Sequence, residues 1–260
     1  MNSQSFDNLD TSSNIDWDYI SSQPQRLPED FIRKNADRVN WISICQHQKL
    51  SEDFIREFAN RVKWYWISRY QVLSEDFIRE FTHEVDWITI SQYQELSESF
   101  IREFAHEVDW CMISKYEGLS ESFIREFAHK VDWRMISKYQ GLSESFIREF
   151  AHKVGWCMIS KYQVLSESFI REFADRVNWI SICKYQTLSE DIIRWISSDD
   201  VDWHRISEYQ NLSIEFIREH QEYLFATDNV VQTIKNAHAE QTLRLGKLPT
   251  EICTLIATYL

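Results

Sequence analysis

Residues 50–72 read LSEDFIREFANRVKWYWISRYQV, and the chain repeats this 23-residue pattern along most of its length. Each repeat begins at a leucine, and a one-residue slip precedes the last repeat. The starts are Leu27, Leu50, Leu73, Leu96, Leu119, Leu142, Leu165, Leu188 and Leu212. A fixed period of this length is typical of a solenoid, in which each repeat buries its apolar face only against its neighbours. We therefore expect an extended stack of repeats rather than one globular core.

Each repeat carries the start signals of two short helices. In the repeat quoted above, Ser51 is placed to cap a helix, and Glu52 follows where an acidic side chain is favourable. Apolar side chains then recur at three- and four-residue spacing from Phe54 to Val62, which predicts one buried helix face. A second cap residue, such as Asp86, precedes the tryptophan that recurs in every complete repeat.

The predicted fold is an all-α solenoid of about nine two-helix repeats, closed by a C-terminal helical cap. Gly118 and Gly141 fall just past the predicted second helix, where a C-cap favours glycine. The alternative is a β/α leucine-rich-like solenoid, because residues 41–44 alternate and the period lies in that range. Residues 64–67 and 133–136 break the alternation, which favours two helices.

The expected domain organisation has three parts. Residues 1–14 form a polar, disordered tail, residues 15–223 form the solenoid, and residues 224–260 form a C-terminal helical region. The polar start lacks the apolar core of a signal peptide, and no 18-residue apolar run is present to cross a membrane. The five cysteines are widely spaced, which is typical of a reduced protein. We expect a soluble protein of the cytoplasm or nucleus.

Comparison of the repeats separates positions fixed by packing from positions that vary. The leucine, phenylalanine, isoleucine and tryptophan positions recur with little change, so they form the frame of the repeat. One further position holds only small side chains and predicts a close contact between helices. It is occupied by Ser68, Ser91, Ser114, Ser137 and Ser160, and by Cys45 and Cys183 in two repeats.

Variable positions on the second helix form a candidate target-binding strip. Lysines meet methionine or aromatic side chains there, and such a surface suits adaptable recognition of an acidic or amphipathic protein. The candidates are Tyr65, Trp66, Met112, Lys115, Met135, Lys138, Met158, Lys161 and Lys184. The alternative is a solvated face on which the residue type varies between repeats without a role in binding.

Nucleic-acid binding and catalysis are disfavoured. The formal net charge of −13 opposes nucleic acid, because duplex binding depends on Lys and Arg neutralising phosphates. His83-Glu84 and His106-Glu107 begin like the zinc motif HExxH, but a tryptophan stands where the second histidine would be. Four glycines leave no glycine-rich phosphate loop. We therefore expect no enzyme, no cofactor and no metal site.

The chain ends with the segment LGKLPTEICTLIATYL, residues 245–260. Matches to the first part of an F-box fall at Leu248, Pro249, Glu251, Ile252, Ile256, Tyr259 and Leu260. The segment is similar to the truncated F-box-like domain that ends poxviral ankyrin-repeat proteins, the PRANC arrangement. That resemblance implies docking on the adaptor subunit of a host cullin–RING ubiquitin ligase, while the repeats select a target. The implied docking residues are Leu248, Pro249, Ile252, Ile256 and Leu260.

Two readings of the whole chain stay open. The 23-residue repeat resembles repeat proteins that large DNA viruses of protists encode in many copies, which implies a viral, host-directed interaction protein. With the F-box-like end, the chain would be a substrate-recruiting adaptor. Without it, the chain is a plain interaction scaffold whose last helix caps the stack, since the first repeat also begins with Leu27-Pro28.

Overall fold

The structure is a computed structural model that describes residues 16–23, 26–116, 118–196, 201–225 and 227–245. The described residues are helical, with turns between the helices and no strand. The all-α prediction is therefore confirmed, and the leucine-rich-like alternative is wrong. The chain divides into two compact units, an N-terminal block of residues 1–132 and a C-terminal block of residues 133–260.

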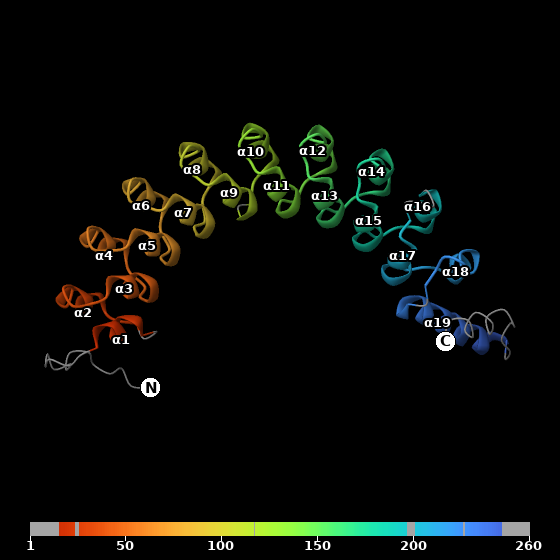
Figure 1. The fold of residues 1–260 in the computed structure, drawn as a ribbon, viewed down its shortest axis with the longest axis horizontal. Helices are drawn as coiled ribbons and strands as arrows, with labels where there is room; N and C mark the ends of the chain where they lie inside the picture. The colour runs from red at the N-terminus through yellow and green to blue at the C-terminus, as the bar shows by residue number, and fades with distance from the viewer. Residues whose placement is uncertain (1–15, 24–25, 117, 197–200, 226, 246–260) are drawn as a thin grey trace. The chain divides into compact units, whose positions relative to one another are not determined.

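The N-terminal block alternates two kinds of short helix. Odd-numbered helices begin at the recurring tryptophan, and even-numbered helices begin after the capping serine or its equivalent. They are α1 (Trp17–Ser22), α2 (Glu29–Lys34), α3 (Trp41–His47), α4 (Glu52–Glu57), α5 (Trp64–Tyr70), α6 (Glu75–Glu80), α7 (Trp87–Tyr93), α8 (Glu98–Glu103), α9 (Trp110–Tyr116) and α10 (Glu121–Glu126). Each odd-numbered helix packs against the next one, from α1 to α9, and the even-numbered helices form a second row (Figure 1).

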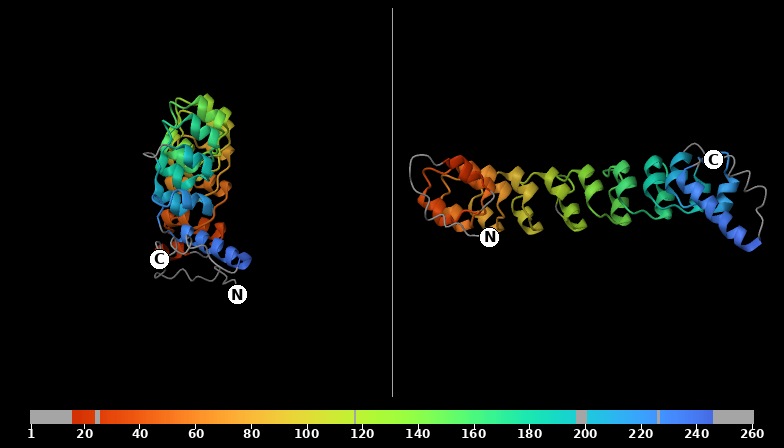
Figure 2. Two further views of the ribbon diagram at one scale, coloured as in Figure 1. Left: turned by 90° about the vertical axis from the view of Figure 1, so that its right-hand side faces the viewer. Right: turned by 90° about the horizontal axis from the view of Figure 1, so that it is seen from below.

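The C-terminal block continues the same alternation and ends in a longer helix. Its helices are α11 (Trp133–Tyr139), α12 (Glu144–Glu149), α13 (Trp156–Tyr162), α14 (Glu167–Glu172), α15 (Trp179–Tyr185), α16 (Glu190–Trp195), α17 (Trp203–Tyr209), α18 (Ile214–Glu219) and α19 (Asp228–Leu245). The odd-numbered helices again pack in sequence, and α19 also contacts α18. Figure 2 shows α19 as the longest helix of this block.

Helix α19 takes the place of the second helix of the last repeat, although the tryptophan that marks this helix elsewhere is missing. The Phe225 N–H donates to Ser207 Oγ at 2.9 Å, the same bond that links earlier repeats. Asn229 Nδ2 donates to the carbonyl of Gln210 at 2.6 Å, and Val230 and Ile234 are buried. The last repeat is therefore complete in structure although its sequence has diverged.

The predicted helix starts are confirmed, whereas two predicted helix ends are wrong. Ser51 Oγ accepts the Phe54 N–H at 3.2 Å, and Asp86 Oδ1 accepts the Thr89 N–H at 2.8 Å. Helix α4 ends at Glu57, because Phe58 leaves the helical conformation with φ −111° and ψ 27°. The apolar positions beyond Glu57 therefore lie in a turn and not in the helix. Gly118 and Gly141 do not take up the left-handed C-cap conformation. The C-caps described for the tryptophan-led helices are extended glutamines, as at position 163.

Aromatic contacts hold each repeat to the next. The Trp156 ring centroid lies 6.3 Å from that of Phe169 and 4.9 Å from that of Phe173, both in the following repeat. Phe169 is fully buried, and full burial of a side chain of this size contributes roughly 1.5–3 kcal/mol. Trp156 Nε1 donates to the Ala151 carbonyl at 3.0 Å, which fixes the indole ring in its own repeat.

The small-residue position does more than allow a close contact. Ser91 is fully buried on α7, and its hydroxyl donates to the Trp87 carbonyl at 2.7 Å. The same oxygen accepts the Asp109 N–H of the following repeat at 2.9 Å. Cys45 replaces the serine in one repeat, and its Sγ accepts the Lys63 N–H at 3.4 Å. The predicted close packing is confirmed, and a hydrogen bond between repeats accompanies it.

A row of buried glutamines forms a second link between repeats, which the sequence did not predict. Gln163 Nε2 donates to the carbonyls of Ser137 and Gln140, at 3.0 and 2.8 Å. Its Oε1 accepts the Leu142 N–H at 3.0 Å. One side chain thus satisfies two backbone groups of the preceding repeat and one at the start of its own. We call this row the glutamine ladder; its described members are Gln48, Gln71, Gln94, Gln140, Gln163, Gln186 and Gln210.

Candidate protein-interaction surface

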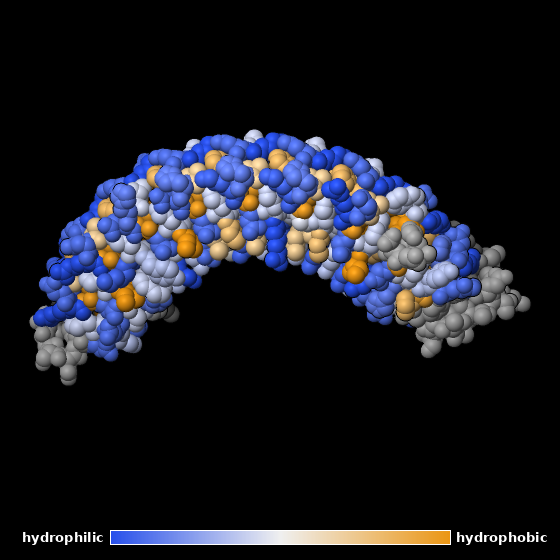
Figure 3. Space-filling view, turned by 45° about the horizontal axis from the view of Figure 1, so that its top comes forward, coloured by the Kyte–Doolittle hydropathy of each residue, from blue (hydrophilic) through white to orange (hydrophobic). Residues whose placement is uncertain are grey.

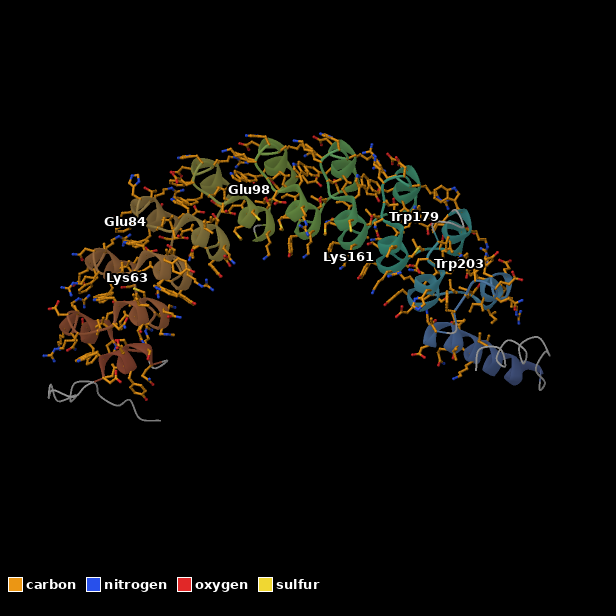
Figure 4. The ribbon with its side chains drawn as sticks, viewed as in Figure 1. Lys63, Glu84, Glu98, Lys161, Trp179 and Trp203 are labelled. Atoms are coloured by element: carbon orange, nitrogen blue, oxygen red, sulfur yellow. The ribbon has the colours of Figure 1, made fainter. Side chains whose placement is uncertain are left out.

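The tryptophan-led helices of the C-terminal block present a repeated pair of side chains. In α13 the apolar Ile159 and the small Ser160 are fully buried. The next two residues, Lys161 and Tyr162, therefore lie on the opposite side of the last helical turn, half-buried and exposed respectively. Figure 4 labels Lys161 on this helix. The same pair recurs at the end of α11 and α15.

Lysines and tyrosines alternate along this surface. Lys138 Nζ lies 4.6 Å from the ring centroid of Tyr139 in its own helix and 5.4 Å from that of Tyr162 in the next. Lys161 Nζ lies 4.9 Å from Tyr162 and 5.0 Å from Tyr185. Each ammonium thus bridges two rings within the range of cation–π attraction.

The pattern extends to a third lysine. Lys184 Nζ lies 5.3 Å from the Tyr185 ring centroid and 4.7 Å from that of Tyr209 on α17. We call this set the lysine–tyrosine ladder; it comprises Lys138, Tyr139, Lys161, Tyr162, Lys184, Tyr185 and Tyr209. The tyrosines remain 42–46% exposed although they contact the lysines. The ladder therefore offers exposed tyrosine side chains together with fixed positive charge.

Hydrogen bonds to tyrosine hydroxyls favour the charged form of two of these lysines. A hydrogen bond with Tyr162 raises the pKa of the Lys161 amine, and a hydrogen bond with Tyr209 raises that of Lys184. Among the described residues, none of the three ladder lysines forms an ion pair with a carboxylate. A strip of lysines without ion-pair partners is unusual on a chain with a net charge of −13.

The even-numbered helices carry a different, self-neutralised surface. Arg56 forms an ion pair with Glu80 of the next repeat at 2.7 Å and with Asp53 of its own helix at 2.9 Å. Glu52 Oε1 accepts the Ser74 N–H across the same junction at 2.7 Å. Exposed ion pairs of this kind contribute little each. Figure 3 shows this face as mainly hydrophilic, with apolar residues in small separate spots.

Of the predicted strip residues in the N-terminal block, Tyr65 and Trp66 belong to an aromatic cluster around Arg69 on α5, whereas Met112 and Lys115 lie two repeats further on. Arg69 on α5 lies 5.4 Å from the Tyr70 ring centroid and 4.7 Å from that of Tyr93, and it donates to Tyr65 Oη at 3.2 Å. The predicted Trp66 stacks on Tyr70 at 5.7 Å, so it joins the same aromatic cluster. Met112 and Lys115 lie on α9, both half-buried.

In the C-terminal block, the structure joins the predicted lysines into the ladder, whereas the predicted methionines lie at the other end of the same helices. Met135 and Met158 are half-buried near the start of α11 and α13, one turn before the ladder lysines. The ladder tyrosines were missed as candidates. Their signal was present in the sequence, because a tyrosine directly follows each of the lysines at 138, 161 and 184.

The cysteines and histidines do not gather into a metal-binding group in the part of the chain that the structure describes. No group of three metal-binding side chains gathers there. The four described cysteines are free thiols. Burial raises the pKa of the Cys45 thiol to about 11, which keeps it protonated at neutral pH. His106 is 71% exposed and its Nε2 lies 3.7 Å from Glu107.

The segment that resembles an F-box, with Leu248, Pro249, Ile252, Ile256 and Leu260, lies outside the described residues. Within the described ranges, no helix is long and apolar enough to span a membrane. No protein-family model, curated protein or solved structure matches this chain. The regular helical scaffold by itself suggests a protein-interaction repeat.

Proposed function

We propose that this chain is a non-enzymatic interaction protein whose lysine–tyrosine ladder binds an acidic, partly apolar segment of a partner protein. The observation that carries the proposal is the alternation of three lysines with four exposed tyrosines across successive repeats. Carboxylates would pair with the lysines, and apolar side chains would lie on the tyrosine rings.

The amino acids of the ladder suit this role. Tyrosine offers a large contact area at low cost in conformational entropy. Each lysine is already held between two rings, so it loses less conformational entropy when a partner binds. The rest of the chain is acidic, which opposes a nucleic acid as the occupant of the same strip.

A peptide-display selection on the purified protein tests this proposal. The wild type is expected to enrich peptides that combine Asp or Glu with apolar residues. The variant K138E/K161E/K184E is expected to lose them. A matched control, K49E/R218E/K235E, makes the same change in net charge at exposed positions outside the ladder and is expected to keep them. Equal enrichment by both triple variants would refute the role of the ladder.

We further propose that residues 245–260 dock on the adaptor subunit of a cullin–RING ubiquitin ligase in the cytoplasm or nucleus of a host cell. The support for this second part is the F-box-like sequence, with Leu248, Pro249, Ile252, Ile256 and Leu260 as the docking residues. The repeats would then deliver a bound target for ubiquitination, as the resemblance to viral repeat proteins implies. The competing function is a plain scaffold in which the same segment only caps the stack.

The double change of Ile252 and Ile256 to Glu separates the adaptor from the scaffold. An adaptor is expected to keep its melting temperature and to lose binding of the purified ligase adaptor subunit in a pull-down. A scaffold is expected to lose several kcal/mol of stability, because two charges would enter an apolar contact. Failure of the wild type to bind the ligase subunit would leave the scaffold function alone.

A further inference from the structure

A surface groove of about 510 Å³ lies beside α5 and α6 in the N-terminal block. Half-buried Trp64 and Phe81 line it together with exposed Glu80, His83 and Glu84. Glu84 belongs to the turn between α6 and α7 (Figure 4). The groove thus joins an aromatic surface to acidic side chains.

Other repeats fill the corresponding place with a cation of their own. Lys130 stands in the same repeat position as Glu84, and its Nζ lies 5.8 Å from the centroid of Trp110 in the preceding repeat. The same ammonium donates to the Ala105 carbonyl at 2.8 Å. In another repeat, the Arg61 guanidinium donates to the Ala36 carbonyl of the preceding repeat at 3.0 Å.

The same arrangement recurs at further repeats. Lys153 Nζ lies 5.7 Å from the Trp133 ring centroid, and the Arg38 guanidinium lies 5.8 Å from that of Trp17. The Arg176 guanidinium donates to the Ala151 carbonyl of the preceding repeat at 3.1 Å. The fold itself therefore shows which chemical group this position accepts: an ammonium or guanidinium over the indole, bonded to the adjacent carbonyl.

At Trp64 the cation is missing and a carboxylate replaces it. In the described part of the chain, no Lys or Arg lies over the Trp64 ring, and the Ala59 carbonyl accepts only Trp64 Nε1, at 3.2 Å. Lys63 is exposed just before α5 (Figure 4), and it does not line the groove. Glu80 is already paired with Arg56, so Glu84 supplies the free negative charge.

The next repeat has the same substitution. Glu107 occupies the corresponding position above Trp87, whose Nε1 donates to the Thr82 carbonyl at 3.0 Å. Successive helices pack roughly 8–10 Å apart. In an extended polyproline II segment, which advances about 3.1 Å per residue with three residues per turn, two basic side chains three positions apart lie on the same side and span about 9 Å.

We propose that the grooves over Trp64 and Trp87 bind two Lys or Arg side chains of a basic, extended segment in a partner protein. Each cation would lie over an indole, as Lys130 does over Trp110, and would pair with Glu84 or Glu107. This surface has the opposite charge to the lysine–tyrosine ladder, so the inference does not depend on the ladder or on the ligase segment.

The test measures anisotropy of a fluorescent peptide with two arginines three positions apart in a Gly-Ser context. The variant E84K/E107K gives both repeats the lysine that Lys130 supplies natively, so it fills the grooves with groups the fold already accommodates. We expect saturable binding to the wild type and at least a tenfold weaker affinity for this variant. E84Q/E107Q, which only removes the charges, should weaken binding to a lesser degree.

The control variant E95K carries a lysine at an exposed loop position of the same block, and the double variant E95K/E57K makes the same change in net charge as E84K/E107K.

 Both controls are expected to bind the peptide as the wild type does, because neither changes a groove. A matched peptide with citrulline in place of both arginines keeps the size and loses the charge, and it is expected to bind at least tenfold more weakly.

Four results would overturn the proposal. They are equal binding to the wild type and E84K/E107K, equal binding of the arginine and citrulline peptides, loss of binding in the control variants, and full competition by spermidine at the peptide's own concentration. The last result would assign the grooves to a small polyamine instead of a protein segment. Thermal melts of every variant accompany the titrations, and E84Q/E107Q keeps the test valid if the lysine variant fails to fold.

Discussion

The glutamine ladder makes a quantitative prediction about what holds the repeats together. Replacing Gln163 with Leu keeps a side chain of similar size but removes its amide. Three backbone groups then lose their partner: the Leu142 N–H and the carbonyls of Ser137 and Gln140. A buried group without a hydrogen bond costs about 1–3 kcal/mol. Taking the lower end for each, and allowing for the added apolar surface, we expect a loss of about 3 kcal/mol in the free energy of unfolding.

Urea denaturation followed by circular dichroism measures this loss, with Gln92→Leu as the control because Gln92 is only half-buried and lies outside the ladder. The control is expected to change stability by less than about 0.5 kcal/mol, as surface substitutions do. Amide hydrogen exchange gives a local readout, since the Leu142 N–H should exchange faster in the Gln163 variant. A loss below about 1 kcal/mol with unchanged exchange at Leu142 would refute the structural role of the ladder.

Three further predictions concern the frame and its thiols. Replacing Trp133 with Ala in the middle of the array should cost about 3–5 kcal/mol, whereas the same change at Trp17, in the first described helix, should cost much less; equal losses in urea melts would contradict nearest-neighbour stacking. Exposed Cys157 should react with iodoacetamide in the native protein well before buried Cys45, whose raised pKa keeps it as the thiol; peptide mass spectrometry reports the order, and equal rates would contradict the described burial. Glu117 occupies the sequence position of a ladder glutamine, although it lies outside the described residues. Glutamine at this position should raise stability by about 1 kcal/mol in the same melts, because its amide can donate to backbone carbonyls and a carboxylate cannot. A loss of stability would count against the ladder register.

The fold could be predicted because its determinants are local in the sequence. The 23-residue period, the cap at Ser51 and the small side chain at Ser91 each act within one repeat or between two adjacent ones. The helix ends were harder to predict. Apolar spacing continues past Glu57 although the helix does not, because the same stripe is buried by a turn.

The links between repeats could not be predicted from residue type alone. Gln163 donates hydrogen bonds to backbone carbonyls of the preceding repeat, and every residue type carries such a carbonyl, so the sequence does not indicate the partner. For the candidate surface, the lysines were found because they vary against a constant frame. Tyr162 was missed because it recurs as regularly as a core residue, and only its 42% exposure distinguishes it from one.

Site-specific photocrosslinking tests the central claim most directly. A photoreactive phenylalanine analogue replaces Tyr162 on the ladder or, as the control, Val164, which is 94% exposed in the loop just beyond it. Both variants are irradiated with an acidic peptide recovered by display on the wild type. The proposal predicts an adduct from position 162 that disappears when K138E and K184E are added, and little or no adduct from position 164. Equal adducts from both positions, or an adduct at 162 that survives the loss of the two lysines, would contradict binding at the lysine–tyrosine ladder.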